Sequence, residues 1–257
     1  MLELSDITFR YRKRGRPTLD SVSMTLSDGE IGILLGRNGS GKTTLFTNIL
    51  GIRKPESGTM RFDGRDLGHI SRTERAGLIA YVPQHIHFGA LTVYDSILMG
   101  RVAGFGMKAG REDFEVVERV MAERGLEGYA ERNAEELSGG EKQKIAIARA
   151  MAQEPKLLVF DEPTGNLDIA NEQLILTEAK KLSRRKGISI LSSLHDLNQA
   201  YHFGDRFFFL KEGKLLHSGG RESFTPELIW EIFGIEVQIL EVNGQKIIMG
   251  GTDYEVS

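Results

Sequence analysis

The octapeptide GRNGSGKT occupies residues 36–43 and carries the clearest pattern in the chain. It fits G-x-x-x-x-G-K-[ST], the spacing of a loop whose glycines let backbone N–H groups converge on phosphate oxygens. The apolar run IGILL, residues 31–35, precedes it and predicts a buried strand. TTLFTNILG, residues 43–51, follows with apolar residues at helical spacing. Strand, glycine-rich loop and helix in this order indicate a nucleotide-binding α/β core.

The loop and the first helical residue are expected to hold the phosphates of a nucleotide. Lys42 can reach the β- and γ-phosphates, and the Thr43 hydroxyl is a ligand for Mg²⁺. The helix dipole favours negative charge at this end. A glycine-rich turn with a chance Lys-Thr pair is the alternative, and the flanking strand and helix disfavour it. The expected nucleotide-binding residues are Gly36, Arg37, Asn38, Gly39, Ser40, Gly41, Lys42, Thr43 and Thr44.

KLLVFDEPT, residues 156–164, places two carboxylates at the end of a second buried strand. Ligands of open α/β sheets bind at the carboxyl ends of the strands. We expect Asp161 to hold the Mg²⁺ shell and Glu162 to polarise an attacking water. The alternative is an acidic turn that caps a strand, which the phosphate loop upstream makes less favourable. The two motifs together predict an NTPase.

LSGGE, residues 137–141, has the outline of a helix start. Ser138 is a candidate N-cap and Glu141 its N3 partner in a capping box. Gly139 and Gly140 fill the first turn, where each costs about 1 kcal/mol relative to Ala. Two bare glycines at a helix N-terminus suit close approach of an anion. The chain therefore carries a second candidate phosphate cradle, distant in sequence from the first.

LSGGE, the phosphate loop, KLLVFDEPT and the later SSLHD together resemble the ABC ATPase family over nearly the whole chain. In that family two subunits pair head to tail, and each signature loop closes over the nucleotide that the other subunit holds. The resemblance implies ATP as the nucleotide, Mg²⁺ as the metal and an ATP-dependent homodimer. It implies that the partner's ATP contacts Ser138, Gly139, Gly140 and Glu141.

Further positions match the family singly. Gln84, in YVPQ, matches the glutamine that senses metal and γ-phosphate, and His195, in SSLHD, matches the switch histidine. Tyr11 matches the aromatic that stacks on adenine, with Phe9 as a weaker rival. Asp168 ends GNLD, the loop after the second carboxylate, where the family more often has a small residue followed by Ala or His.

These matches define the implied chemistry of the site. The implied catalytic residues are Lys42, Gln84, Glu162 and His195. The implied Mg²⁺ ligands are Thr43, Gln84 and Asp161.

The expected fold class is α/β: a P-loop NTPase core of ABC type with an N-terminal antiparallel β subdomain and an inserted α-helical arm. Residues 1–84 and 156–230 would form the nucleotide-binding core, and 85–155 the helical subdomain. Residues 231–257 would form a C-terminal β-hairpin extension. Its turn signal is Asn243-Gly244, the dipeptide typical of type I′ hairpins.

Stretches outside the motifs resemble one particular group of ABC transporter subunits. Residues from about 60 to 237 are similar to ATPase subunits of importers for iron-siderophores, haem, cobalamin and related chelates. This implies two membrane-spanning permease subunits and, indirectly, a substrate-binding protein as partners. The apolar segment HIHFGALTVYDSILMGRVAGFGM, residues 85–107, is the expected docking surface for the permease. The alternative is that this segment only packs the helical arm.

Composition bounds the remaining choices. The chain has 257 residues, a formal net charge of -3 and no cysteine, which excludes disulfides and thiolate metal sites. Its one basic cluster, residues 10–16, predicts a solvated loop, so no nucleic-acid partner is expected. Neither a signal peptide nor an apolar run long enough for a membrane span is visible. We therefore expect a cytoplasmic protein, peripheral on the inner face of the cell membrane.

Two other functions remain open. A non-transport ABC ATPase of DNA repair or translation usually carries a coiled-coil insertion, a tandem cassette or a basic surface. An exporter subunit is often fused to membrane helices.

Overall fold

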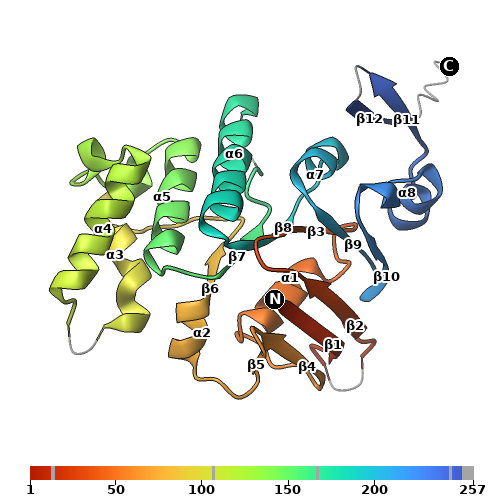
Figure 1. The fold of residues 1–257 in the computed structure, drawn as a ribbon, viewed down its shortest axis with the longest axis horizontal. Helices are drawn as coiled ribbons and strands as arrows, with labels where there is room; N and C mark the ends of the chain where they lie inside the picture. Colours follow the sequence, from red (N-terminus) through yellow and green to blue (C-terminus); the bar gives the residue numbers. More distant parts are fainter. Residues whose placement is uncertain (13–14, 106–107, 166–167, 243–244, 251–257) are drawn as a thin grey trace.

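The computed structural model describes residues 1–12, 15–105, 108–165, 168–242 and 245–250. Three sheets and their flanking helices make up this part of the chain (Figure 1). The helices are α1 (Lys42–Ile49), α2 (Arg72–Leu78), α3 (Val93–Leu98), α4 (Arg111–Arg124), α5 (Gly139–Ala152), α6 (Ile169–Lys186), α7 (Leu197–Phe203) and α8 (Pro226–Phe233). Short 3-10 turns are η1 (Met99–Gly104), η2 (Glu127–Tyr129), η3 (Ala134–Glu136) and η4 (Arg221–Ser223).

A six-stranded sheet in the order β10-β9-β3-β8-β7-β6 forms the centre. All neighbours pair in parallel except β10, which is antiparallel to β9. Because the strands are parallel, the carboxyl ends of β3, β7 and β8 meet at one edge, where ligands bind in such sheets. The strands are β3 (Ile31–Leu35), β6 (Ile79–Val82), β7 (Leu157–Asp161), β8 (Ser189–Ser193), β9 (Arg206–Lys211) and β10 (Lys214–Gly219).

Both faces of this sheet are covered, which explains its continuous apolar runs. In β9, Phe207 and Phe209 pack into the core on the side of α5 and α6. Phe208 and Leu210, at the alternate positions, pack into the core shared with α1 and the N-terminal sheet. All four side chains are fully buried. The period of two residues along a strand thus divides one apolar run between two cores.

The N-terminal sheet has the order β2-β1-β4-β5 and is antiparallel throughout. Its strands are β1 (Leu2–Phe9), β2 (Leu19–Leu26), β4 (Ser57–Phe62) and β5 (Arg65–Asp66). It lies beside α1 in Figure 1. The expected α/β class and the N-terminal antiparallel sheet are therefore confirmed.

The chain between β6 and β7 is helical, and α3, α4 and α5 pack against one another on one side of the molecule (Figure 1). The segment LTVYDSILMGR does not form one continuous helix, because α3 ends at Leu98 and continues as the tighter turn η1. Gly100 lies so close to α5 that a Cβ there would be 2.1 Å from the Arg149 carbonyl oxygen. This close approach suits glycine and marks where the path of the chain is constrained.

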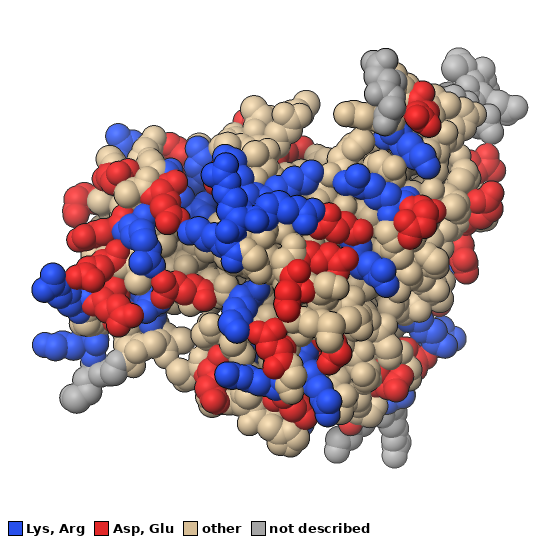
Figure 2. Space-filling model, in the orientation of Figure 1, with Lys and Arg blue, Asp and Glu red and all other residues tan. Residues whose placement is uncertain are grey.

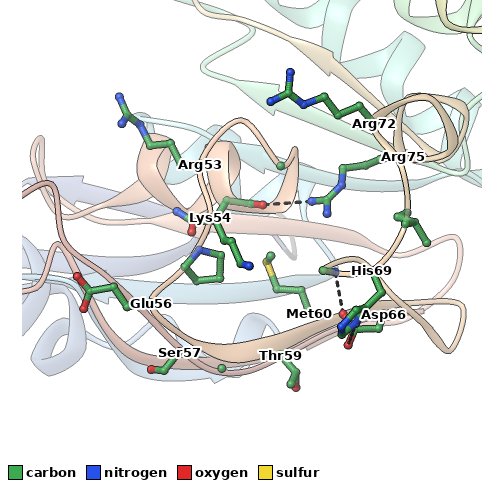
Figure 3. Close-up of a pocket in the computed structure, with 16 residues that line it drawn as sticks. Arg53, Lys54, Glu56, Ser57, Thr59, Met60, Asp66, His69, Arg72 and Arg75 are labelled. Carbon is green, nitrogen blue, oxygen red and sulfur yellow. Dashed lines mark hydrogen bonds and ion pairs between the residues drawn. The ribbon is translucent and has the colours of Figure 1, made fainter.

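Arg75 joins α2 to the end of α1. Its buried guanidinium donates to the backbone oxygens of Ile49, at 2.9 Å, and of Leu67. Figure 3 shows Arg75 pointing from α2 toward the chain that leaves α1. A Cβ on Gly51, which has φ of 71°, would lie 2.7 Å from the guanidinium carbon. Burial lowers the pKa of Arg75, and the charge of Asp66 opposes this shift.

The C-terminal segment contains α8 and a two-stranded antiparallel sheet, β11 (Val237–Val242) and β12 (Gln245–Gly250). The Asn198 side chain on α7 holds β12, because it accepts the Ile248 N–H at 2.7 Å and donates to the Ile248 carbonyl at 2.9 Å. The predicted turn at Asn243-Gly244 lies outside the described residues. Within the described ranges, no helix is long and apolar enough to span a bilayer.

Candidate nucleotide-binding site

The phosphate loop follows β3 and leads into α1. Its glycines are required by space and by backbone conformation. A Cβ on Gly36 would lie 2.2 Å from the Leu210 carbonyl oxygen. Gly41 is the N-cap of α1 with φ of 113°, in the region that L-residues with side chains rarely adopt. No side chain of the described residues caps the start of α1, so its first N–H groups are available to an anionic ligand.

Lys42 closes this loop. Its ammonium donates to the carbonyl oxygen of Gly36 at 2.8 Å and to that of Arg37 at 3.3 Å. Burial lowers the pKa of Lys42, while the carboxylates of Glu162 and Asp161 oppose this shift. Lys42 thus places its positive charge at the mouth of the loop, facing the two carboxylates.

Tyr11 borders the same concavity and is held by three neighbours. Its hydroxyl lies 3.1 Å from Thr44 Oγ1, and the Arg53 guanidinium carbon lies 4.5 Å from its ring centroid. Phe9 packs edge-on against it with ring centroids 5.1 Å apart. Tyr11 is 55% exposed, whereas Phe9 is 7% exposed and belongs to the core. The geometry therefore favours Tyr11 over Phe9 as an aromatic platform for a base.

Asp161 ends β7 and is 3% exposed. Its Oδ1 accepts the Ser193 hydroxyl at 2.9 Å, and its Oδ2 lies 3.4 Å from the Tyr81 hydroxyl. Burial, and then the charge of Asp161, raise the pKa of Tyr81 to about 12. An ionised carboxylate offers about four lone-pair positions, so these contacts leave acceptor capacity for further partners.

Glu162, the next residue, turns its side chain toward the phosphate loop. Its φ is 53°, a left-handed conformation that is uncommon for residues other than glycine. One carboxylate oxygen lies 2.6 Å from His195 Nε2, and the other accepts the Gln84 side-chain amide. The chain segments that follow β6, β7 and β8 thus bring together three side chains that lie far apart in sequence.

One pocket of about 470 Å³ joins these groups. Its lining residues are Tyr11, Thr18, Asn38, Gly39, Gly41, Lys42, Thr43, Thr44, Gln84, Glu162 and His195. Gly36, Arg37 and Ser40 belong to the same loop without lining the pocket, and Asp161 directly precedes Glu162. Of the described residues that line this pocket, none belongs to LSGGE or is Asp168.

The residues present fit a magnesium nucleotide. The Ser40 hydroxyl is buried and has no hydrogen-bond partner among the described residues. The Thr43 hydroxyl, the Gln84 amide and the Asp161 carboxylate offer oxygen ligands, which Mg²⁺ prefers, and Mg²⁺ usually keeps several waters as well. The donor set is therefore suitable for Mg²⁺ held partly through water.

The LSGGE segment forms the capping box that its sequence predicts. The Ser138 N–H donates to Glu141 Oε2 at 2.9 Å, and the Glu141 N–H donates to the Ser138 hydroxyl. Hydrogen bonds from the Ser138 hydroxyl and N–H lower the pKa of Glu141. The capping-box interpretation is confirmed, and it leaves Ser138 and Gly139 at the surface.

Asp168 is connected to the LSGGE segment through Asn171. It is the N-cap of α6 and accepts the Asn171 N–H at 2.8 Å and the Asn171 side-chain amide at 2.9 Å. A Cβ on Gly140 would lie 2.5 Å from the Asn171 Oδ1 atom. Gly140 therefore makes room for a side chain that Asp168 holds.

A second hollow, of about 380 Å³, lies between the end of α1, β4 and α2 (Figure 3). Two of its basic side chains already bond protein oxygens: Arg75 to backbone carbonyls and His69 to Asp66 at 3.0 Å. Its described lining includes no residue of the phosphate loop. We assign it no ligand.

The sequence analysis assigns no role to Tyr81, Ser193 or Thr18, although Tyr81 lies in YVPQ and Ser193 lies in SSLHD. Tyr81 and Ser193 contact Asp161 because β6, β7 and β8 are adjacent in the sheet. Thr18 lines the pocket from its position directly before β2 of the N-terminal sheet. Their signal lies in strand register rather than in a local pattern. The sequence offers one indication of these two residues: Tyr81 lies three residues before Gln84, and Ser193 lies two residues before His195.

Comparisons with known proteins agree with this geometry. The family model described as ABC transporter matches residues 19–165, more than half of the chain. An uncharacterised ABC transporter ATP-binding protein of Methanocaldococcus jannaschii is 36% identical over 97% of each chain. The petrobactin import ATP-binding protein of Bacillus anthracis is 34% identical and covers 94% of this chain and 89% of its own.

Solved structures give the same result. A structure described as a metal-chelate type ABC transporter in an inward-facing conformation is 27% identical, with a TM-score of 0.83 and coverage of 97% of this chain and 96% of that chain. An ATP-binding cassette solved as a dimer in a post-hydrolysis state with ADP and phosphate is 28% identical, with a TM-score of 0.76 and coverage of 87% and 100%.

The fold and the pocket define a P-loop nucleotide hydrolase with an antiparallel N-terminal sheet. The chain belongs to the ABC transporter family, as an ATP-binding subunit with the ATPase activity of that family.

Proposed function

We propose that this protein is the ATPase subunit of an importer for a metal chelate, such as an iron-siderophore, haem or cobalamin. The observation that carries this proposal is the likeness to the metal-chelate type transporter over almost the full length of both chains. The petrobactin-import relative supports the same class of cargo. In this proposal the protein lies on the inner face of the cell membrane, bound to two permease subunits that receive cargo from a substrate-binding protein.

The pocket residues take the following roles in this proposal. Tyr11 stacks on adenine, the loop N–H groups and Lys42 hold the phosphates, and Glu162 accepts a proton from the attacking water. His195 and Gln84 fix the Glu162 carboxylate, which is supported by their contacts with its two oxygens. Bound Mg²⁺, held by Thr43, Gln84 and Asp161, would supply charge neutralisation on the phosphoryl oxygens.

The signature residues are proposed to act on the nucleotide of a second copy. Support comes from their position, since the described lining of the pocket does not include them. The relative solved as a dimer with ADP and phosphate supports pairing of two subunits. Asp168, linked through Asn171 to Gly140, would lie at the same subunit interface.

The permease is proposed to dock on the apolar segment 85–107 and the neighbouring α2. A groove of about 250 Å³ lies there, lined by residues of α2 and η1 and by Gln153. Met99 and Val102, in the same turn η1, are 52% and 44% exposed. Exposed apolar side chains next to a groove are typical of a protein-binding surface.

The non-transport alternative would need a surface for nucleic acid. Figure 2 shows Lys and Arg gathered in the middle of this face, over α6. Several Lys and Arg of α6 are ion-paired: Lys181 with Glu178, Arg184 with Asp205, and Lys186 with Glu123. We propose that this region is a solvated, charge-balanced face and that the protein binds no nucleic acid.

Purification from its native membrane tests this proposal. An affinity-tagged Glu162→Gln protein should retain two permease subunits after detergent extraction, and nucleic acid or ribosomes should be absent. The reconstituted wild-type complex should hydrolyse ATP faster with binding protein loaded with one chelate than with empty binding protein. Recovery with ribosomes or nucleic acid and without membrane proteins would favour the non-transport function.

A further inference from the structure

Ser193 touches both carboxylate residues of the site. It is the last residue of β8, fully buried, and faces Asp161 across the parallel pair β7–β8. The Glu162 N–H donates to its hydroxyl oxygen at 3.0 Å, and the hydroxyl donates to Asp161 Oδ1 at 2.9 Å. One hydroxyl therefore joins the metal-side carboxylate to the backbone of the proposed catalytic one.

The direction of these hydrogen bonds is determined by chemistry. A backbone N–H can only donate, so the Ser193 oxygen must accept from Glu162 and give its single proton to Asp161. Asp161 then serves as an acceptor, with its other oxygen toward the Tyr81 hydroxyl. The orientation of the Asp161 carboxylate depends on this proton.

Glu162 needs such a contact. Strand β7 ends at Asp161, and Glu162 turns into a left-handed conformation with φ of 53°. Its N–H bonds to a side chain of β8, and this contact holds the peptide at the turn that aims the carboxylate at the pocket. Uncommon backbone conformations persist where the surrounding structure determines them.

We propose that Ser193 is a positioning residue that sets Asp161 and Glu162 together through one hydroxyl; this rests on the proposed roles of the two carboxylates. Ser193 is expected to contact neither substrate nor metal. Its effect is to keep the proposed base and the metal-side carboxylate in register when the site closes on nucleotide.

Ser192 provides a matched control. It is the preceding residue of β8 and equally buried, and its hydroxyl donates to the Ser193 carbonyl at 3.3 Å. Side chains alternate along a strand, so Ser192 lies on the opposite face of the sheet. Ser192→Ala removes a buried hydroxyl of the same kind without touching either carboxylate.

The experiment compares Ser193→Ala, Ser193→Thr and Ser192→Ala in the full-length protein. Steady-state ATP hydrolysis gives kcat and KM, fluorescence titration gives the Kd of ATP with Mg²⁺ and with EDTA, and thermal unfolding gives Tm. Ser193→Ala should lower kcat at least about tenfold, because small misplacements of reacting groups are costly. The Kd in EDTA should stay close to wild type, while the gain in affinity from Mg²⁺ shrinks. Ser193→Thr should restore both quantities, and Ser192→Ala should resemble wild type.

Equal kcat and equal Mg²⁺-dependent affinity in Ser193→Ala and Ser192→Ala would overturn the proposal. If Ser193→Ala does not fold, Ser193→Thr and Ser193→Val decide, since they share a shape and differ in the hydroxyl. Equal activity and Mg²⁺ response in that pair would also overturn it. If Glu162→Gln hydrolyses ATP as fast as wild type, the proposed role of Glu162 is wrong. The Mg²⁺-dependent Kd of the Ser193 variants would still test the contact between Ser193 and Asp161.

Discussion

Glu162 combines an uncommon backbone conformation with two side-chain neighbours, and its substitution gives a direct test of the chemistry. Glu162→Gln keeps the shape but removes the basic oxygen, so ATP should still bind while kcat falls at least about 100-fold. Phosphate release and nucleotide titration measure the two effects. Glu212→Gln is the control, because Glu212 also has a positive φ, of 47°, and lies outside the pocket. Wild-type turnover in Glu162→Gln would remove this residue from its proposed role.

Glu141 gives a prediction about pH. Its pKa is lowered by hydrogen bonds from Ser138, so the folded state favours the ionised form. This contribution to stability is complete above the ordinary pKa of 4.5 and is lost as pH falls through the lowered value. Glu141→Gln can still accept the capping hydrogen bonds but does not titrate there.

Thermal unfolding between about pH 6 and pH 3.5 measures the effect, since it spans the ordinary titration range of carboxylates. The Tm of the wild type should fall more steeply with acid than that of Glu141→Gln. Glu136→Gln, on the turn η3, should keep the wild-type slope. Identical slopes in all three proteins would show that the capping box does not couple to protonation.

Local sequence patterns are sufficient to identify Lys42, Asp161 and Glu162, because the spacing of a phosphate loop and a strand-end acid pair lies within a few residues. Ser193 and Tyr81 could not be identified in this way. Their roles depend on which strands are neighbours and in which register, and Asp161 meets Ser193 only because β7 and β8 pair in parallel. Site residues that act through other residues are encoded in the topology rather than in a motif.

Arg75 links two elements, and its removal should loosen α2. Arg75→Ala leaves buried carbonyl oxygens of Ile49 and Leu67 without their charged donor, which should cost about 3 kcal/mol of unfolding free energy. Urea denaturation measures this loss. Arg72→Ala, one turn earlier and exposed, should change stability little. Equal stability of the two variants would mean that α2 does not depend on the Arg75 contact.

Helices and strands were predictable to different degrees. Buried strands such as β3 and β7, and the presence of an inserted helical arm, followed from the sequence. The division of α3 from η1 did not, because it depends on the contact of Gly100 with α5. Helix α8 was not predicted, although Thr225 caps it, Pro226 opens it and Gly234 ends it. The extents proposed for the core, the helical subdomain and the hairpin extension remain predictions.

In the whole molecule, the candidate pocket and the LSGGE segment lie in separate places. The phosphate loop and Glu162 line one pocket, and the signature segment lies on another part of the surface. On the proposed function, a complete cradle around the γ-phosphate requires two copies, each supplying the part that the other lacks. Assembly and catalysis are then the same event, because closure of the dimer completes the charge-neutralising shell.

The mass of the Glu162→Gln protein in solution tests this directly. With Mg-ATP it should be a dimer, and without nucleotide it should be a monomer. Adding Ser138→Arg places a bulky side chain where the partner's phosphate would lie, so the dimer should be lost while each subunit still binds ATP. Ser71→Arg is the matched control, because Ser71 is the N-cap of the capping box on α2, and its loss weakens a helix start of the same kind.

A dimer that Ser138→Arg abolishes and Ser71→Arg preserves would establish that LSGGE contacts the partner's nucleotide. A monomer in every condition, with ATP bound, requires the same test with the permease subunits present, since they would bring two subunits together. ATP hydrolysis in that complex, with Glu162 restored, should be sensitive to Ser138→Arg and insensitive to Thr225→Arg, a substitution at the N-cap of α8, which is not part of the proposed permease surface. Equal hydrolysis by both variants there would contradict the head-to-tail arrangement, because the signature would then have no part in closing the site.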